Sequence, residues 1–499
     1  MSPNQVIPVE NGALSPIAER VLKVPSLTYE YGTDGIVIAV KDELIVRTIP
    51  FNTSSAFRNA LLEVADRVGS LAQIQRSPTT IVKPRSPWWE DGGPAGPKDH
   101  PPAADGPLSK LEIWRLKDPR TRNSIDESRR LRPLALQQRV KTSDGRDLVL
   151  PAISPNHVAI LSATAGGCPA APPKPAPPPD GDFVLPPSPA ATAKVTILDS
   201  GYIWTHPPHH NLDRRVTVVH GQWLDTNTTP PSWKPDKPDG VYRDPRGQLD
   251  GISGHGTFIA GLIAHIAPDA SLEAVGLRNQ EVEIPGHMNR ATQLGLFETE
   301  AAIAHAMLQR CDTDVIQCGF AFPTLDDYPS LPFAAVMDEL RQPNAPHNGG
   351  VAVVAPAGNE RSRRRYWPAA LPDVIGVAST NRRGNARAWF SNWGDWCDCC
   401  TRGEHVYSTF VDFDGSVEGE PLTDIEHFRG WARWDGTSFA APKVSAAIAK
   451  LLPASSAGTR PVDAWNDLIT GAGGVPISSV TDATLSGPPG VSLRNLHIW

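Results

Sequence analysis

The sequence lacks any uninterrupted run of about 18 apolar residues, the length that a membrane-spanning helix requires. Residues 1–20 have neither the basic start nor the apolar stretch of a secretory signal. Cysteine is scarce, and six cysteines in 499 residues fit a reducing compartment. We therefore expect a cytoplasmic protein that has no membrane partner.

The chain is rich in proline and has enough apolar residues for a globular core. It contains 51 prolines and is 40% hydrophobic, and its length is comfortable for two domains. The net charge of −7 is uneven, because residues 110–146 hold 11 Lys and Arg against 5 Asp and Glu. Such a basic segment can bind nucleic acid, but its only aromatic residue is Trp114. We interpret it as a solvated basic face and expect no nucleic-acid partner.

Local patterns divide the chain into five parts. Residues 169–189 contain 10 prolines in 21 residues, which favours a semi-rigid linker and marks the main boundary. The predicted parts are an irregular lead-in (1–34), an α+β N-terminal region (35–166), the linker (167–190), a catalytic domain (191–455) and a C-terminal extension that packs on it (456–499). In the N-terminal region the patterns predict strands over 43–49, 71–74, 79–82 and 147–160 and a helix over 57–68.

Four motifs in the second half carry side chains suited to nucleophilic catalysis. Ser438 lies among small residues at the start of a predicted helix, so its hydroxyl should point outward. His255 lies between two glycines at the start of another helical pattern, and Asp199 ends an apolar strand that would hold a carboxylate rigidly. Asn359 follows a further apolar strand and carries an amide that can donate to an oxyanion. Together they predict a nucleophile, its base, an orienting carboxylate and an oxyanion donor.

These residues resemble the motifs of the subtilisin-like serine proteases, the subtilases of peptidase family S8. The resemblance runs from about residue 194 to residue 452 and includes DSG at Asp199, GHGT at His255, APAGNE at Asn359 and GTSFAAP at Ser438. It implies a catalytic triad of the first, second and fourth residues, with the third in the oxyanion hole. The strand–helix alternation of this region separately favours a mostly parallel sheet covered on both faces. We expect an α/β fold, a subtilisin-like three-layer αβα domain preceded by a smaller α+β domain that resembles a propeptide.

The resemblance also implies where a substrate would bind. An extended substrate would pair with the backbone around Gln317, Cys318 and Gly319, and one side chain would enter a pocket walled by Ala357 and Gly358. We expect a serine endopeptidase that acts on protein or peptide substrates through an acyl-enzyme intermediate and needs no cofactor. The alternative is a regulated protease component of a larger assembly, held inactive by its N-terminal half until a regulatory protein partner or signal releases it.

Two groups of residues invite a metal interpretation. Cys397, Cys399 and Cys400 form a C-x-C-C cluster, but in the family such a segment is a buried strand, so Cys397 and Cys399 should share one face as core thiols. An H-x-x-H-H pattern from His206 to His210 could ligate zinc, yet prolines interrupt it. We predict a loop there, and no metal site.

Two charged clusters suggest a lid over the pocket. Residues 361–365 hold four arginines directly after the motif of Asn359, and residues 412–426 hold six acidic residues and no Lys or Arg. One hypothesis is that the acidic segment folds toward the arginines and partly occludes the pocket. The alternative is two solvated loops on opposite rims. Phe258, which stands where the family usually has a second histidine, is a further departure that bears on substrate preference.

Overall fold

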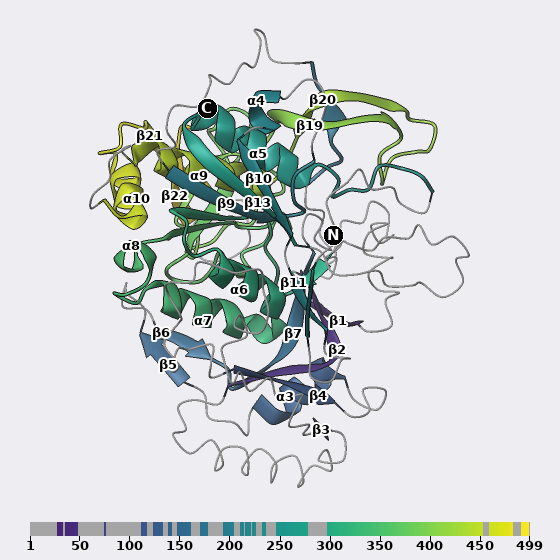
Figure 1. Cartoon of the computed structure of the whole chain (residues 1–499), viewed down its shortest axis with the longest axis vertical. Coiled ribbons are helices and arrows are strands. Elements are labelled where there is room, and N and C mark those ends of the chain that lie inside the picture. The colour runs from purple at the N-terminus through teal and green to yellow at the C-terminus, as the bar shows by residue number, and fades with distance from the viewer. Residues whose placement is uncertain are drawn as a thin grey trace.

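Figure 1 shows the computed structural model of the chain, with the larger domain above the smaller one. The structure describes residues 27–32, 35–47, 74–75, 111–116, 123–132, 138–141, 147–160, 170–177, 193–203, 210–213, 215–220, 222–225, 232–235, 246–277, 297–452, 459–482 and 491–498. The helix expected over 57–68 and the strand expected over 79–82 lie outside these residues.

A nine-stranded sheet forms the centre of the larger domain. Its order is β10-β13-β9-β15-β16-β17-β18-β22-β21, and every neighbouring pair is parallel except β21 with β22. The strands are β9 (Ala193–Asp199), β10 (Val216–His220), β13 (Ala270–Gly276), β15 (Val315–Cys318), β16 (Ala352–Pro356), β17 (Ile375–Thr380), β18 (Cys399–Arg402), β21 (Ile477–Asp482) and β22 (Val491–Leu496). The C-terminal residues thus supply two strands of the sheet.

Helices cover both faces of this sheet. Buried strands send alternate side chains to opposite faces, and in β16 Ala352 and Val354 join one core cluster whereas Val353 and Ala355 join another. The first cluster includes residues of α5 (His255–Ile266), α9 (Thr437–Leu451) and α10 (Pro461–Thr470), and the second those of α6 (Glu300–Gln309) and α7 (Leu331–Leu340). The predicted three-layer αβα architecture is confirmed, and none of the described helices is both long and apolar enough to cross a membrane.

The register of the sheet brings three turns to one edge. Val315 of β15 pairs with Val195 of β9 and with Ala352 of β16, so these central strands run level. Parallel strands that run level end at the same edge. The residues that end or follow them, Asp199 after β9, Gly319 after β15 and the turn after β16, therefore meet there.

A long hairpin extends from the sheet domain, at the upper right in Figure 1. It consists of β19 (Val406–Gly415) and β20 (Glu426–Trp434), and the linker adds a third strand, β8 (Lys174–Pro175), antiparallel to β20. Part of the predicted linker is therefore docked on the catalytic domain, because the edge of β20 offers backbone partners to an extended segment.

The smaller domain is built on a separate antiparallel sheet. Its strands are β1 (Leu27–Gly32), β2 (Gly35–Arg47), β3 (Ile74–Gln75), β4 (Leu111–Leu116) and β7 (Ile153–Ile160), with α3 (Ser124–Leu131) packed against it. The sheet also contains β14 (Phe297–Thr299) of the catalytic domain, which pairs with β7. Residues 27–32, predicted to be irregular lead-in, instead pair with β2 as β1, because their extended backbone completes its edge.

The cysteine segment follows the prediction only in part. Cys397, Cys399 and Cys400 are buried free thiols, and burial raises the pKa of each. The expected shared face is wrong, because β18 begins only at Cys399. Cys399 packs in the cluster of α5 and α9, whereas Cys397 and Cys400 pack in that of α6 and α7.

Short elements complete the described chain. They are β5 (Gln138–Lys141) with β6 (Asp147–Leu150), α4 (His210–Asp213), β11 (Gln222–Asp225) with β12 (Ser232–Pro235), the 3-10 turn η4 (Leu325–Asp327) and α8 (Pro346–Gly349). The strand pair predicted over 147–160 corresponds to β6 and β7. His210 begins α4, while His206 and His209 lie outside the described residues.

Candidate active site

Asp199 and His255 form the best-defined contact of the site. Asp199 ends β9, and both of its carboxylate oxygens lie within hydrogen-bond distance of Nδ1 of His255, at 2.9 and 2.8 Å. His255 is the first residue of α5, and both side chains are fully buried. Because a carboxylate only accepts, Nδ1 carries the hydrogen and Nε2 is the basic nitrogen. Nε2 is buried and makes no hydrogen bond within the described part of the chain.

Two glycines leave room for this pair. A β-carbon on Gly319 would lie 1.6 Å from Oδ2 of Asp199, and one on Gly256 would lie 2.0 Å from the carbonyl oxygen of Gly201. Both distances are far below any allowed contact, so a larger residue would displace the carboxylate or the start of α5. The glycines of the GHGT motif and of the turn after β15 are therefore required by close packing.

Aromatic rings surround the imidazole of His255. Its ring centroid lies 5.7 Å from that of Trp434 and 5.3 Å from that of Phe439. Phe258 packs against both aromatic residues, with centroids 5.6 and 4.5 Å away. The phenylalanine that departs from the family motif thus belongs to an apolar cluster behind the base, where a second imidazole would have to be buried.

Ser438 lies on the second residue of α9 and faces the same turns. Its Oγ donates a 3.5 Å hydrogen bond to the carbonyl oxygen of Gly319, the glycine packed against Asp199. The next residue, Phe439, contacts His255 through its ring. The structure therefore brings the predicted nucleophile, base and carboxylate into one buried cluster, although their chemical roles stay a prediction.

Asn359 is tied to the nucleophile through Thr437. Its Oδ1 accepts from the backbone N–H of Thr437 at 2.8 Å and from the Thr437 hydroxyl at 2.9 Å. A backbone N–H can only donate, so the accepting atom must be the carboxamide oxygen, and the NH2 group supplies the donors. Asn359 thus holds its amide next to Ser438, as an oxyanion donor would require.

The predicted pocket wall lies in a tightly packed turn after β16. Ala357 is fully buried, and Gly358 has a φ of 97°, in the left-handed region where glycine is favoured. The Gly358 N–H donates to the Thr437 hydroxyl at 3.1 Å. Both residues therefore lie directly beside the oxyanion donor.

The sequence prediction missed Asn392, which holds this turn. Its Oδ1 accepts from the N–H groups of Glu360 and Ser362, both at 3.0 Å, and its Nδ2 donates to the Ala357 carbonyl at 2.9 Å. No local pattern marks an asparagine that satisfies the backbone of a turn more than 30 residues away.

The structure corrects the substrate-pairing role predicted for Gln317 and Cys318. Gln317 lies inside the sheet, paired with Ile197 on one side and with Val354 on the other, so its backbone has no free edge. Its side chain accepts from the Ser445 hydroxyl at 2.6 Å and donates to the Cys318 carbonyl at 2.6 Å.

Cys318 is equally inaccessible. It ends β15, pairs with Leu198 and packs in the core, where burial raises the pKa of its thiol. Gly319 is the first residue beyond the strand. A substrate could reach only Gly319 and the residues that follow it.

The acidic lid hypothesis is wrong for the residues with described contacts. Asp414 contacts His427 and Arg429 within the hairpin, while Glu420 and Glu426 bind Lys174, each at 3.0 Å. The arginine loop has a different acidic partner, because Arg364 forms an ion pair with Asp327. Among the described contacts none joins the two clusters, since the hairpin pairs with the linker instead. The described residues also contain no group of His, Cys, Asp or Glu that could hold a metal ion.

Comparison with known proteins identifies the family. Residues 190–472 match the model of the subtilase family, peptidase S8. The chain is 27% identical to a thermophilic serine proteinase of Bacillus sp. (strain AK1) over 52% of this chain and 51% of that protein, and 26% identical to thermitase of Thermoactinomyces vulgaris over 52% and 74%. It thus spans about half of the first relative. Fervidolysin of Fervidobacterium pennivorans aligns in structure at a TM-score of 0.44 and 16% identity, over 85% of this chain and 56% of that one. On the family match, which covers more than half of its residues, the chain belongs to the subtilase family.

Proposed function

We propose that this protein is a serine endopeptidase that uses Asp199, His255 and Ser438 as a triad. The observation that carries the proposal is the buried Asp199–His255 hydrogen bond, which leaves Nε2 basic beside the helix of Ser438. A subtilase with all four motif residues in one cluster has the groups that acyl transfer needs.

The reaction follows from the position of each group. His255 Nε2 accepts the proton of Ser438 Oγ as that oxygen bonds to the carbonyl carbon of the substrate. The negative charge that develops on the carbonyl oxygen is stabilised by the Asn359 NH2 group and the Ser438 N–H. His255 then donates its proton to the departing amine, and water cleaves the acyl-enzyme by the same steps. Asp199 stabilises the imidazolium that forms in each half.

Labelling with a fluorophosphonate tests the nucleophile. Intact protein should be labelled at Ser438 and should cleave an unstructured protein substrate, while Ser438→Ala should lose both activities and keep its fold. Ser479→Ala, which changes an exposed serine of β21, is the matched control and should behave as wild type. Labelling of Ser438→Ala at the wild-type rate would contradict the assignment.

The alternative, a protease held inactive by its N-terminal half, is supported by one observation. The pairing of β14 with β7 joins the two halves through backbone hydrogen bonds, and a buried hydrogen bond of 2.8 Å joins Glu300 to His157. If the N-terminal half restrains the enzyme, intact protein should label slowly, and protein cut in the linker and freed of residues 1–190 should label fast. Equal rates would argue for an enzyme that is active as the full chain.

A further inference from the structure

The loop from Gly319 to Tyr328 connects the active site to the N-terminal domain. Its first residue accepts the hydrogen bond of Ser438 Oγ and packs against Asp199. At its far end, the 319–328 loop leads into Ser330, which caps α7. Any displacement of this loop would therefore be felt next to the nucleophile.

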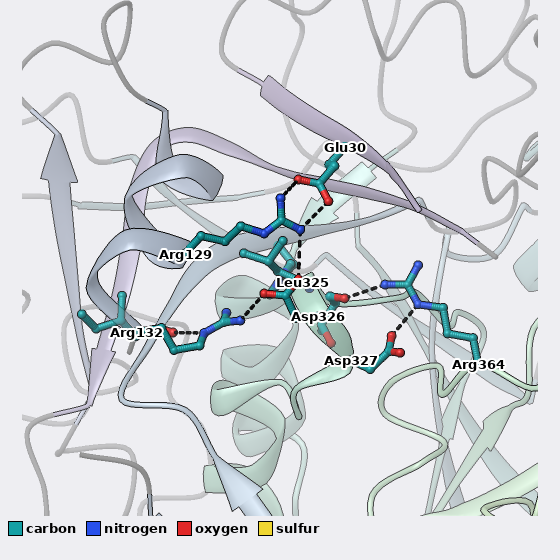
Figure 2. A network of polar contacts seen from close by, with 10 residues as sticks. Glu30, Arg129, Arg132, Leu325, Asp326, Asp327 and Arg364 are labelled. Carbon is teal, nitrogen blue, oxygen red and sulfur yellow. Dashed lines mark hydrogen bonds and ion pairs between the residues drawn. The ribbon is translucent and has the colours of Figure 1, made fainter. Parts of the chain in front are cut away.

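The 319–328 loop is joined to the loop that follows Asn359. Phe322 and Trp367 exchange two backbone hydrogen bonds of 3.1 and 2.8 Å. Figure 2 shows the guanidinium of Arg364 directed at the same loop, where it donates to the Thr324 carbonyl at 2.8 Å and to the carboxylate of Asp327. The loop after the oxyanion residue and the loop after β15 are therefore held as one unit.

The tip of the 319–328 loop inserts into the N-terminal domain. Leu325 is buried in a cluster with Val37 and Ala39 of β2 and Ile125 of α3. Its backbone N–H donates to Nε2 of His157 on β7 at 3.0 Å. A leucine of the catalytic domain thus completes an apolar cluster of the other domain, and its N–H is satisfied there.

Two arginines of α3 hold the residue next to this leucine. Asp326 accepts from Arg129 at 2.9 Å and from Arg132 at 2.8 Å, as Figure 2 shows. Arg132 lies 4.4 Å from the ring centroid of Tyr328 and donates to the Ile153 carbonyl of its own domain. The basic segment is therefore not only a solvated face, because two of its arginines bind the catalytic domain.

The tip adopts a backbone conformation that needs support. Asp326 and Asp327 have φ angles of 56° and 58°, in the left-handed region that non-glycine residues rarely occupy. Two such residues in succession persist where their surroundings hold them. Here the support comes from Arg129, Arg132 and Arg364, together with the burial of Leu325.

We propose that the N-terminal domain positions the 319–328 loop for substrate binding and stays docked while the enzyme works. This inference rests on the proposed peptidase function. Without the domain, Leu325 would be exposed to water and Asp326 would lose both arginines, so the loop would populate several conformations. Substrate would bind only the fraction with the competent arrangement, and its apparent affinity would fall in proportion. Leu325 and Asp326 are positioning residues, since neither touches the triad.

The test uses the full chain and separates substrate affinity from nucleophile reactivity. Asp326→Asn removes the charge and keeps a residue that tolerates positive φ. Arg132→Gln removes one partner, and the double variant closes a mutant cycle. Arg130→Gln is the matched control, because the described ion pair of Arg130 is with Glu127 of the same helix. The measurements are KM and kcat for a peptide substrate, the fluorophosphonate labelling rate, and the unfolding midpoint in the Ser438→Ala background.

We expect Asp326→Asn to raise KM about tenfold, at the low end for losing a charge-assisted hydrogen bond. kcat, the labelling rate and the midpoint should change little, because the triad has its own contacts. Arg132→Gln should act in the same direction, and the double variant should be no worse than Asp326→Asn alone. Arg130→Gln should match wild type.

Three results would overturn the inference. They are an unchanged KM in Asp326→Asn, a parallel loss of kcat and labelling, and a rise in labelling, which would support restraint by the N-terminal half. A wild-type chain that neither labels at Ser438 nor cleaves peptide would instead refute the proposed function, so the two failures are distinguishable.

Discussion

Asn359 owes its orientation to a neighbour of the nucleophile. Both hydrogens that Thr437 can donate go to Oδ1 of Asn359, so the carboxamide cannot turn without breaking two hydrogen bonds. An oxyanion donor is effective when it is oriented before charge develops. At the scale of single residues, the active site is therefore organised by contacts to the backbone and side chain next to Ser438.

The first prediction concerns this donor. Asn359→Ala should lower kcat by about 3 kcal/mol of transition-state stabilisation, a magnitude known for a single oxyanion donor in this family rather than derived from this structure. KM should change little, because the hydrogen bond forms chiefly in the transition state. Steady-state kinetics on a peptide tests this, with Asn385→Ala in an exposed loop as control. Loss of affinity with an unchanged kcat would contradict the role.

Lys443 on α9 carries a second residue-scale prediction. Burial, and secondarily Arg402, lowers the pKa of Lys443 to about 7. Between pH 7 and the pKa of an unfolded lysine the unfolded chain binds more protons, so this group makes stability rise with pH. Below pH 7 the native state must keep a buried charge. Lys443→Met should therefore raise the free energy of unfolding, on the order of 4 kcal/mol at pH 6 and progressively less toward pH 10.

Urea unfolding of Ser438→Ala protein with and without Lys443→Met measures the difference, and the serine change prevents self-digestion. Lys450→Met at the exposed end of the same helix is the control and should show no such pH dependence. A difference that is the same at pH 6 and pH 10 would show that burial of the charge is not the cause.

At the scale of elements, the linker is part of the catalytic domain's surface. Ala170 N–H donates to the Asp435 carbonyl at 2.9 Å, and the Trp434 indole donates to the Ala171 carbonyl at 2.7 Å. These contacts place residues 170–177 along β20, which leads directly to the nucleophile. Proline-rich segments are already extended, so their docking as an added strand costs little backbone entropy.

A charge change should release this strand. Lys174→Glu would place a third carboxylate beside Glu420 and Glu426, which now bind the lysine. We expect faster hydrogen exchange at Ala176, whose N–H donates to the Trp431 carbonyl. Lys174→Met, which removes the attraction without adding repulsion, should have a smaller effect because exposed ion pairs contribute only about 0–1 kcal/mol. Unchanged exchange in both variants would mean that backbone pairing alone holds β8.

At the scale of the whole molecule, the two domains share a sheet and a buried polar network. β14 pairs with β7, and Glu300 binds the ring and the backbone N–H of His157 while accepting from Ser330. Most of these groups are buried, so salt screens them less than exposed pairs. The domains therefore meet through more than the charged contacts of α3.

This network leads to a prediction about a severed chain. A specific protease site placed between residues 178 and 190 of the Ser438→Ala protein should allow the linker to be cut. The halves should then coelute in size exclusion at micromolar concentration, in both low and high salt. Glu300→Gln should weaken the association, whereas Glu339→Gln on α7 should not. Separation of the wild-type halves in low salt would show that the link between them is chiefly covalent.

The sequence by itself determined the family, the fold and the four motif residues, because each motif is a local pattern of strand, turn or helix start. The three-layer architecture follows from the alternation of strands and helices in the same way. The tertiary structure decided what lies far apart in the chain. Gln317 was misassigned because only the sheet order shows pairing on both of its sides. Arg132 and Asp326 meet across 194 residues, and no local pattern encodes an ion pair over that distance.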